Sequence, residues 1–209
     1  MISPISYYGE GELSNMIHWA SFLTYAVVTA ATPGPNNIMS MSNGSQKGFV
    51  RALPFNLGIW VGFSLVMVLC TAFCSALSTL IPKIKTPMLA AGAIYMLYLA
   101  WGMVRSGDHG QREWAGGGFL TGLLLQFVNP KIYLYGIMSM EAYLLPWYHG
   151  HPAVLLGFAL LLAFIGFVFT LCWSAFGSVF QRIFSRHARL VGWVMALLLV
   201  YCALSLFLA

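Results

Sequence analysis

The sequence predicts an all-α integral membrane protein with six transmembrane helices, arranged as two inverted three-helix repeats whose first helices are broken. Hydrophobic residues make up 60% of the 209 residues, charged residues only 7%, and the mean hydropathy is +0.81. A soluble domain carries roughly 25% charged residues, so this chain has too few to cover a surface in water. Its apolar residues form long runs, and two of those runs are interrupted by proline.

Six apolar runs account for nearly the whole chain. A helix needs about 20 mostly apolar residues to cross the hydrocarbon core of a bilayer. The second, fourth and fifth runs are longer, and we expect them to tilt, kink or project past the membrane. The runs lie at residues 17–41, 53–81, 87–104, 117–145, 152–180 and 189–208.

The runs also define the domain organisation. We expect a polar N-terminal tail at residues 1–16, followed by a single transmembrane domain at 17–209. Its two halves are predicted at about residues 17–107 and 108–209. No polar segment between the runs is long enough for a soluble module.

Positive charges predict the orientation of the spans. With six spans, the first, third and fifth loops share one side, and the other side holds only Lys83 and Lys85. Lysine and arginine collect in cytoplasmic loops, so the odd loops are predicted in the cytoplasm and both termini in the periplasm. A five-span alternative would scatter the charges over both sides. The cations of the odd loops are Lys47, Arg51, Arg105, Arg112, Arg182, Arg186 and Arg189.

This placement also accounts for the net charge of +5. Because the cations lie in short loops, topology explains them without a nucleic acid partner. No metal site or cofactor is expected, since His149 and His151 have no third ligand nearby in the sequence. The cysteines lie in apolar runs, as small packing residues do.

The first apolar run contains a strong interruption. Proline lacks an N–H group and frees the carbonyl four residues before it, so Pro33 frees Thr29 and Pro35 frees Ala31. Irregular backbone inside a membrane is tolerated only where protein buries it or where it lines a wet cavity. A plain kink is the alternative, but two prolines around a glycine are hard to explain that way. The segment reads Thr32-Pro33-Gly34-Pro35-Asn36-Asn37.

The fourth run contains a second interruption at Asn129-Pro130-Lys131, where Pro130 frees the carbonyl of Gln126. An ordinary proline kink is an equal alternative for Pro130 alone. Lys131 lies well inside the run, where a charge is costly and indicates a functional site. Alternatively, its long side chain extends to an interface.

The two interruptions fall at corresponding positions, in the first helix of each set of three. An odd number of spans in each half inverts the second half relative to the first. Broken helices at matching positions of two inverted halves indicate the binding site of a transporter. The candidate substrate-binding residues are Thr32, Pro33, Gly34, Pro35, Asn36, Asn37, Gln126, Asn129, Pro130 and Lys131.

One acidic residue, Glu141, lies well inside an apolar run, near its outer end. It is either a proton-coupling candidate or a residue of the outer interface. A membrane enzyme would need paired acids, a histidine cluster or a nucleophile with its base. With five acids in the whole chain, an enzyme is not predicted.

These residues resemble the LysE/RhtB family of amino acid exporters, from about Phe22 to the end of the chain. Thr32-Pro33-Gly34-Pro35-Asn36 matches one hallmark motif of that family, and Asn129-Pro130-Lys131 matches another. Departures are the long N-terminal extension, Pro54 in the second span, and Glu141, which is not a motif position. Further matches are Gly48, Gly58, Gly62, Tyr95, Leu99, Ala100 and Trp101.

The resemblance implies export of small neutral amino acids across the bacterial inner membrane, with proton antiport as the implied driving force. The stretch from Leu125 to Gly136 and the tail from Leu197 to Ala203 are most similar to members that export cysteine and O-acetylserine. Export of homoserine or threonine is the alternative within the family, and a channel is the alternative of another class. A homo-oligomer is possible, because Gly58 and Gly62 could bring helices close within one chain or between two.

A zwitterionic substrate suggests how these residues divide the work. The carboxylate suits the start of a half-helix after Pro35, where free N–H groups favour an anion. Lys131 would supply the matching positive charge. The carbonyls freed at Thr29, Ala31 and Gln126 would receive the ammonium group, and no acid is at hand for a second positive charge. Neutral substrates are therefore expected.

Overall fold

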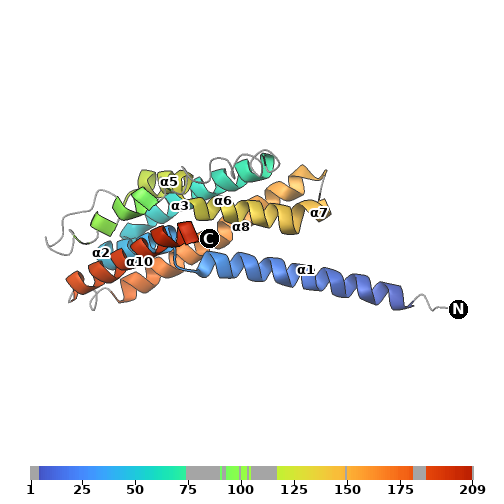
Figure 1. Ribbon diagram of the computed structural model, residues 1–209, viewed down its shortest axis with the longest axis horizontal. Helices are drawn as coiled ribbons and strands as arrows, with labels where there is room; N and C mark the ends of the chain where they lie inside the picture. Colours follow the sequence, from blue (N-terminus) through green and yellow to red (C-terminus); the bar gives the residue numbers. More distant parts are fainter. Residues whose placement is uncertain are drawn as a thin grey trace.

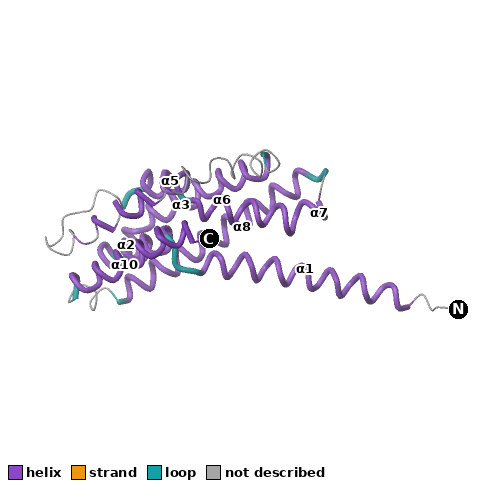
Figure 2. Tube along the Cα trace, viewed as in Figure 1, coloured by secondary structure: helices purple, strands orange, loops and turns teal. Residues whose placement is uncertain are grey.

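The structure is a computed structural model, and in the part of the chain that it describes every regular element is a helix (Figure 2). It describes residues 5–73, 90, 93–98, 100–102, 104, 117–148, 150–180 and 187–208. The predicted third span, residues 87–104, is therefore described only in part. Within the described part, α3 (Phe49–Ala72) and α8 (Pro152–Val179) are long and apolar enough to cross a membrane.

The first helix, α1, spans Ile5–Ala31 and extends well into the segment 1–16, for which the sequence suggests a polar tail. No proline interrupts residues 5–31, so nothing in the sequence ends a helix at residue 16. Its first turns project beyond the other helices (Figure 1). The part of the tail that is described is thus helical and continuous with the first span.

Both proline segments divide their runs into two helices. α1 ends at Ala31, and α2 (Pro35–Lys47) begins after three non-helical residues. α5 (Phe119–Val128) and α6 (Pro130–Met138) are separated by Asn129 alone. Each second helix begins with proline, whose fixed φ angle and missing N–H suit the first position of a helix.

The fourth run changes its winding after α6. The π-helical turn η1 (Ser139–Leu144) and the short helix α7 (Leu145–Tyr148) follow α6 without a gap. The last described helix is α10 (Ala188–Leu208). The excess length of the fourth run is therefore taken up by a break and a π-helical turn.

Glycines bring α3 and α5 into backbone contact. A Cβ atom on Gly58 would overlap the backbone of Phe119, and one on Gly122 would overlap the carbonyl of Phe55. A Cβ atom on Gly62 would lie 2.6 Å from the carbonyl oxygen of Leu123. Small residues permit such close approach of membrane helices. Gly58 and Gly62 thus pack α3 against α5 of the same chain.

The buried apolar residues form two clusters, and each broken helix contributes to both. The first cluster contains Phe22 of α1 and Ile132 of α6. The second contains Ile38 of α2 and Leu125 of α5. The two breaks therefore lie where the clusters meet, and the second broken helix passes between them in the opposite order from the first.

Candidate functional site

The break between α1 and α2 leaves several carbonyl groups outside the helical pattern, and the protein satisfies them. The hydroxyl of Thr32 donates to the carbonyl oxygen of Thr29 at 2.8 Å, and Nε1 of Trp173 donates to that of Ala31 at 3.2 Å. Nδ2 of Asn37 donates to the carbonyl oxygens of Ala30 and Thr32, at 2.8 and 2.9 Å. The freed carbonyls are therefore not vacant ligands for a substrate, as the sequence suggested, because each already accepts a hydrogen bond.

The side chain of Lys131 reaches from α6 into this break. Its Nζ atom lies 2.8 Å from Oγ1 of Thr32 and 3.1 Å from the carbonyl oxygen of Thr32. It also lies 3.2 Å from the position that a Cβ atom would take on Gly34. The carboxyl end of a helix carries partial negative charge, so α1 ends beside a cation. Lys131 bonds to the other broken helix and does not extend along its own.

At the break between α5 and α6, the free backbone groups form hydrogen bonds with residues of the break itself. Oδ1 of Asn129 accepts the backbone N–H of Lys131 at 3.2 Å and thereby caps α6. The backbone N–H of Asn129 donates to the carbonyl oxygen of Gln126 at 3.4 Å. The carbonyl of Gln126 that Pro130 frees is therefore occupied as well.

Three amide side chains join the two breaks. Asn36 and Gln126 exchange two hydrogen bonds, of 2.9 and 3.1 Å, although they are 90 residues apart. Nδ2 of Asn129 donates to Oδ1 of Asn36 at 3.3 Å. Gln126 has no exposed surface, and its Nε2 atom also donates to the carbonyl oxygen of Gly122 at 2.8 Å. A largely buried hydrogen-bonded network of this kind holds both breaks in one geometry.

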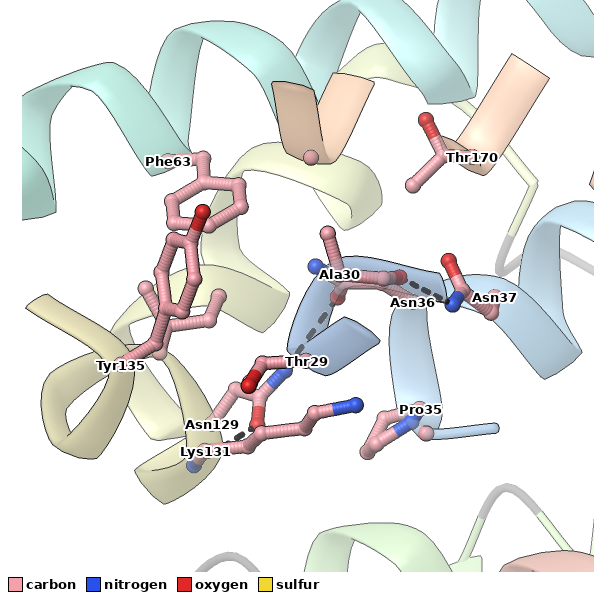
Figure 3. A pocket seen from close by; sticks show the side chains of 13 residues that line it. Thr29, Ala30, Pro35, Asn36, Asn37, Phe63, Asn129, Lys131, Tyr135 and Thr170 are labelled. Carbon is pink, nitrogen blue, oxygen red and sulfur yellow. Dashed lines mark hydrogen bonds between the residues drawn. The ribbon is translucent and has the colours of Figure 1, made fainter. Parts of the chain in front are cut away.

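A pocket lies beside this network (Figure 3). It encloses about 390 Å³ of empty space, its open mouth included. Asn36 and Asn37 of α2 lie across the pocket from the aromatic rings of Phe63 and Tyr135 (Figure 3). The lining residues are Thr29, Ala30, Gly34, Pro35, Asn36, Asn37, Phe63, Asn129, Lys131, Ile132, Tyr135, Gly166 and Thr170.

Six of the ten substrate-binding candidates line the pocket: Gly34, Pro35, Asn36, Asn37, Asn129 and Lys131. Thr32 instead bonds to Lys131, and Gln126 to Asn36, so these two hold lining residues in place. Pro33 and Pro130 shape the breaks and do not line the pocket.

Sequence reasoning named the carbonyl of Thr29 among the other lining residues and missed the rest. Tyr135 lies four residues after Lys131 on the same helix, a spacing that could have indicated it. Ile132 directly follows Lys131, and the helical spacing rule does not point to it. Phe63, Gly166 and Thr170 come from α3 and α8, which carry neither of the two hallmark motifs. Glu141, the proton-coupling candidate, is exposed on η1 and does not line the pocket.

The starts of the two second helices differ in their capping. Asn129 caps α6 with its own side chain, whereas no side chain caps α2 at Gly34. The first N–H groups of a helix lack partners within that helix and favour an anion. Since Gly34, Pro35 and Asn36 all line the pocket, the uncapped end of α2 borders it, with Lys131 alongside.

Comparison with known proteins places these features in a family. The family profile described as LysE type translocator matches residues 27–209. The cysteine/O-acetylserine efflux protein of Klebsiella pneumoniae subsp. pneumoniae is 40% identical over 188 residues, covering 90% of this chain and 95% of the relative. Proteins with the same name from Salmonella choleraesuis and Escherichia coli (strain K12) are 39% and 38% identical, each covering 90% of this chain and 96% of the relative.

These relatives are named as efflux proteins and not as enzymes. No solved structure matches the chain significantly. The profile begins near the end of α1 and covers both breaks and everything after them. Together with its apolar helices, this makes the chain a membrane protein that belongs to the LysE type translocator family.

Proposed function

We propose that the protein exports small neutral amino acids, foremost cysteine and O-acetylserine, across the bacterial inner membrane. The observation that carries this proposal is the position of Lys131 beside the uncapped start of α2 in the pocket. The relatives at 38 to 40% identity, named for cysteine and O-acetylserine efflux, support the choice of substrate.

The carboxylate of the substrate binds between Lys131 and the first N–H groups of α2. Both carry positive charge or partial positive charge, and both are available from one side of the pocket. The Lys131 ammonium bonds to Thr32 at the negative end of α1. A bound carboxylate draws it away from that position.

The ammonium group of the substrate then takes the negative end of α1. Thr29 and Ala30 of α1 line the pocket, and a carbonyl oxygen that already accepts one hydrogen bond has a second lone pair. The described lining contains no aspartate or glutamate. A lysine or arginine substrate would bring a second positive charge beside Lys131 with no acid to neutralise it, which favours neutral substrates.

The substrate side chain lies toward Phe63, Tyr135 and Thr170. A Cβ atom on Gly166 would overlap the ring of Phe63, so the glycine allows this ring to lie back against α8. The hydroxyl of Thr170 is buried and donates to the carbonyl oxygen of Phe167 at 2.8 Å. A small side chain with one weakly polar group suits this wall better than a long or charged one.

Proton antiport is part of the proposal, and both termini are placed in the periplasm. Because Glu141 is outside the pocket lining, a proton that it carries would be coupled to transport through movement of η1, and not through contact with substrate.

Efflux from proteoliposomes preloaded with labelled cysteine, O-acetylserine, threonine or lysine tests the function. We expect the first two to leave faster, and more so under an inward proton gradient. Loss of threonine alone would change the substrate, and steady ionic conductance in a planar bilayer would favour a channel. Absence of loss for all four, from folded protein, would overturn the proposal.

A further inference from the structure

The helix α2 is polar although it is buried. Five of its polar side chains are no more than 8% exposed: Asn37, Ser40, Ser42, Asn43 and Ser45. By contrast α8 and α3, the apolar helices that could span a membrane, expose leucine, valine and phenylalanine side chains. Polar groups inside a membrane protein face the interior or a wet cavity and mark pathways for substrates and ions. The composition of α2 therefore indicates a pathway and not simple packing.

α2 lies directly against α8. A Cβ atom on Gly44 would overlap the backbone of Ser174, and one on Gly177 would overlap the carbonyl of Met41. The two backbones therefore touch, with a glycine from each helix at the contact. Small residues permit this contact, and they also allow two surfaces to separate and close again without side chains interlocking.

The polar side chains of this interface continue from the pocket. Asn37 of α2 and Thr170 of α8 line the pocket. Ser40 lies three residues after Asn37, and Ser174 lies four residues after Thr170, so each lies on the same helix face one turn further on. The backbone contact between Gly44 and Ser174 shows that the two helices run alongside each other away from the pocket.

Two hydroxyl groups in this interface have no hydrogen-bond partner among the described residues. Ser40 and Ser174 have no exposed surface, and their Oγ atoms lack a hydrogen bond to any described residue. Neighbouring hydroxyls of α8 do bond to their own helix, Thr170 to the carbonyl of Phe167 and Ser178 to that of Ala175. A buried hydroxyl without a partner is costly, so it needs an explanation. A state in which water or substrate reaches both groups supplies one.

We propose that the α2–α8 interface is the closed inner section of the substrate path. The helices separate to admit a zwitterionic amino acid and water, and Ser40 and Ser174 then hydrogen-bond to them. The path leads from the pocket to the end of α2, where Lys47 lies beside Gly117 of the segment before α5. Gly44 and Gly177 allow the interface to close again. This inference rests on the proposed export function.

Cysteine accessibility tests the path. Ser40→Cys and Ser174→Cys are made singly and reconstituted, and 2-aminoethyl methanethiosulfonate, a small reagent with an ammonium group, is added to both faces. Peptide mass spectrometry assigns each modified residue, so the native cysteines stay in place. Met39→Cys and Ala163→Cys are matched controls, because both positions are buried in the apolar clusters of the same helices.

We expect Ser40→Cys and Ser174→Cys to be modified at least ten-fold faster than the two controls, and faster still when O-acetylserine is present. A second variant disturbs the close backbone contact between α2 and α8. Gly177→Ala, added to Ser174→Cys, keeps the interface from closing and should raise the modification rate further. Gly157→Ala is its control, since a Cβ atom there meets nothing within 4 Å. Rates at both serine positions equal to those of the controls, and unchanged by Gly177→Ala, would overturn the inference.

The same samples separate this inference from the proposed function. Fast modification of protein that exports none of the tested amino acids would keep the path and overturn the substrate assignment. Export of O-acetylserine by variants whose introduced cysteines stay unreactive would keep the function and overturn the path.

Discussion

The α1–α2 break and the α5–α6 break differ in how their free backbone groups are hydrogen-bonded. Between α5 and α6 one residue is non-helical, and Asn129 caps the new helix with its own side chain. Between α1 and α2 three residues are non-helical, the new helix has no side-chain cap, and part of the hydrogen bonding comes from Lys131 and Trp173 elsewhere in the chain. The α5–α6 break, whose backbone groups bond to residues of the break itself, serves as a structural support. The α1–α2 break depends on donors from other helices and leaves the first N–H groups of α2 uncapped, and we infer that it serves as the binding site.

Removal of the Lys131 charge should have the largest effect. Lys131→Met keeps the length of the side chain but removes the cation from the α1–α2 break and from the proposed carboxylate site. A hydrogen bond to a charged group contributes about 1.5–3 kcal/mol, so substrate affinity should fall roughly ten- to hundred-fold. Concentration-dependent efflux measures it. Arg51→Met, at an exposed position outside the pocket, is the control. Equal affinity for both variants would contradict the assigned role.

Loss of the Asn37 amide should destabilise the break between α1 and α2. Its Nδ2 atom serves the carbonyl oxygens of both Ala30 and Thr32, and only Thr32 has another donor, in Lys131. The Ala30 carbonyl is partly buried, and a fully buried carbonyl without its donor costs about 1–3 kcal/mol, so a loss toward the lower end is expected. Asn37→Leu should therefore lower the thermal unfolding temperature in detergent, and Asn37→Asp should not restore it, since a carboxylate cannot donate. An unchanged unfolding temperature for Asn37→Leu would argue against this role.

Loss of the Asn129 cap should destabilise the break between α5 and α6 by less than the Asn37 substitution destabilises the break between α1 and α2. Replacement of a capping side chain by alanine costs about 1 kcal/mol. Asn129→Ala should lower stability by that order, and Asn129→Ser should recover most of it by capping α6 again. If capping is the main role, transport falls in proportion to the amount of folded protein, with the Michaelis constant unchanged. A changed Michaelis constant in the serine variant would place Asn129 in contact with substrate.

A change at Gly166 should have the smallest effect and alter selectivity. Gly166→Ala pushes the ring of Phe63 toward the pocket, because a Cβ atom there overlaps that ring. The longer O-acetylserine should lose several-fold more transport than cysteine. Gly157→Ala on the same helix is the control. An equal loss for both substrates would show that the ring does not limit substrate size.

Parts of this arrangement could be predicted from the sequence, and parts could not. Proline and asparagine inside apolar runs have a local effect on backbone hydrogen bonding, so both breaks and the candidate residues around them could be located. The bond between Lys131 and Thr32 joins residues 99 apart, and no local rule pairs them.

The pocket-lining residues of α3 and α8 could not be predicted from the sequence either. A membrane helix is apolar both toward lipid and toward the core, so periodicity does not show which face of α8 carries Gly166 and Thr170 inward. The carbonyls freed by proline were predicted as ligands for substrate. Sequence alone could not show that Trp173, Thr32 and Asn129 already donate to them.

Recognition of the substrate carboxylate by Lys131 and the start of α2 can be tested directly with substrate analogues. Efflux of labelled O-acetylserine from proteoliposomes is measured against increasing internal concentrations of cysteine or of cysteine methyl ester, for the parent protein and for Lys131→Met. We expect cysteine to compete at least ten-fold better than its ester in the parent, and the difference to shrink to about two-fold or less in the variant. Equal competition by the ester in the parent would show that the carboxylate is not what this site binds.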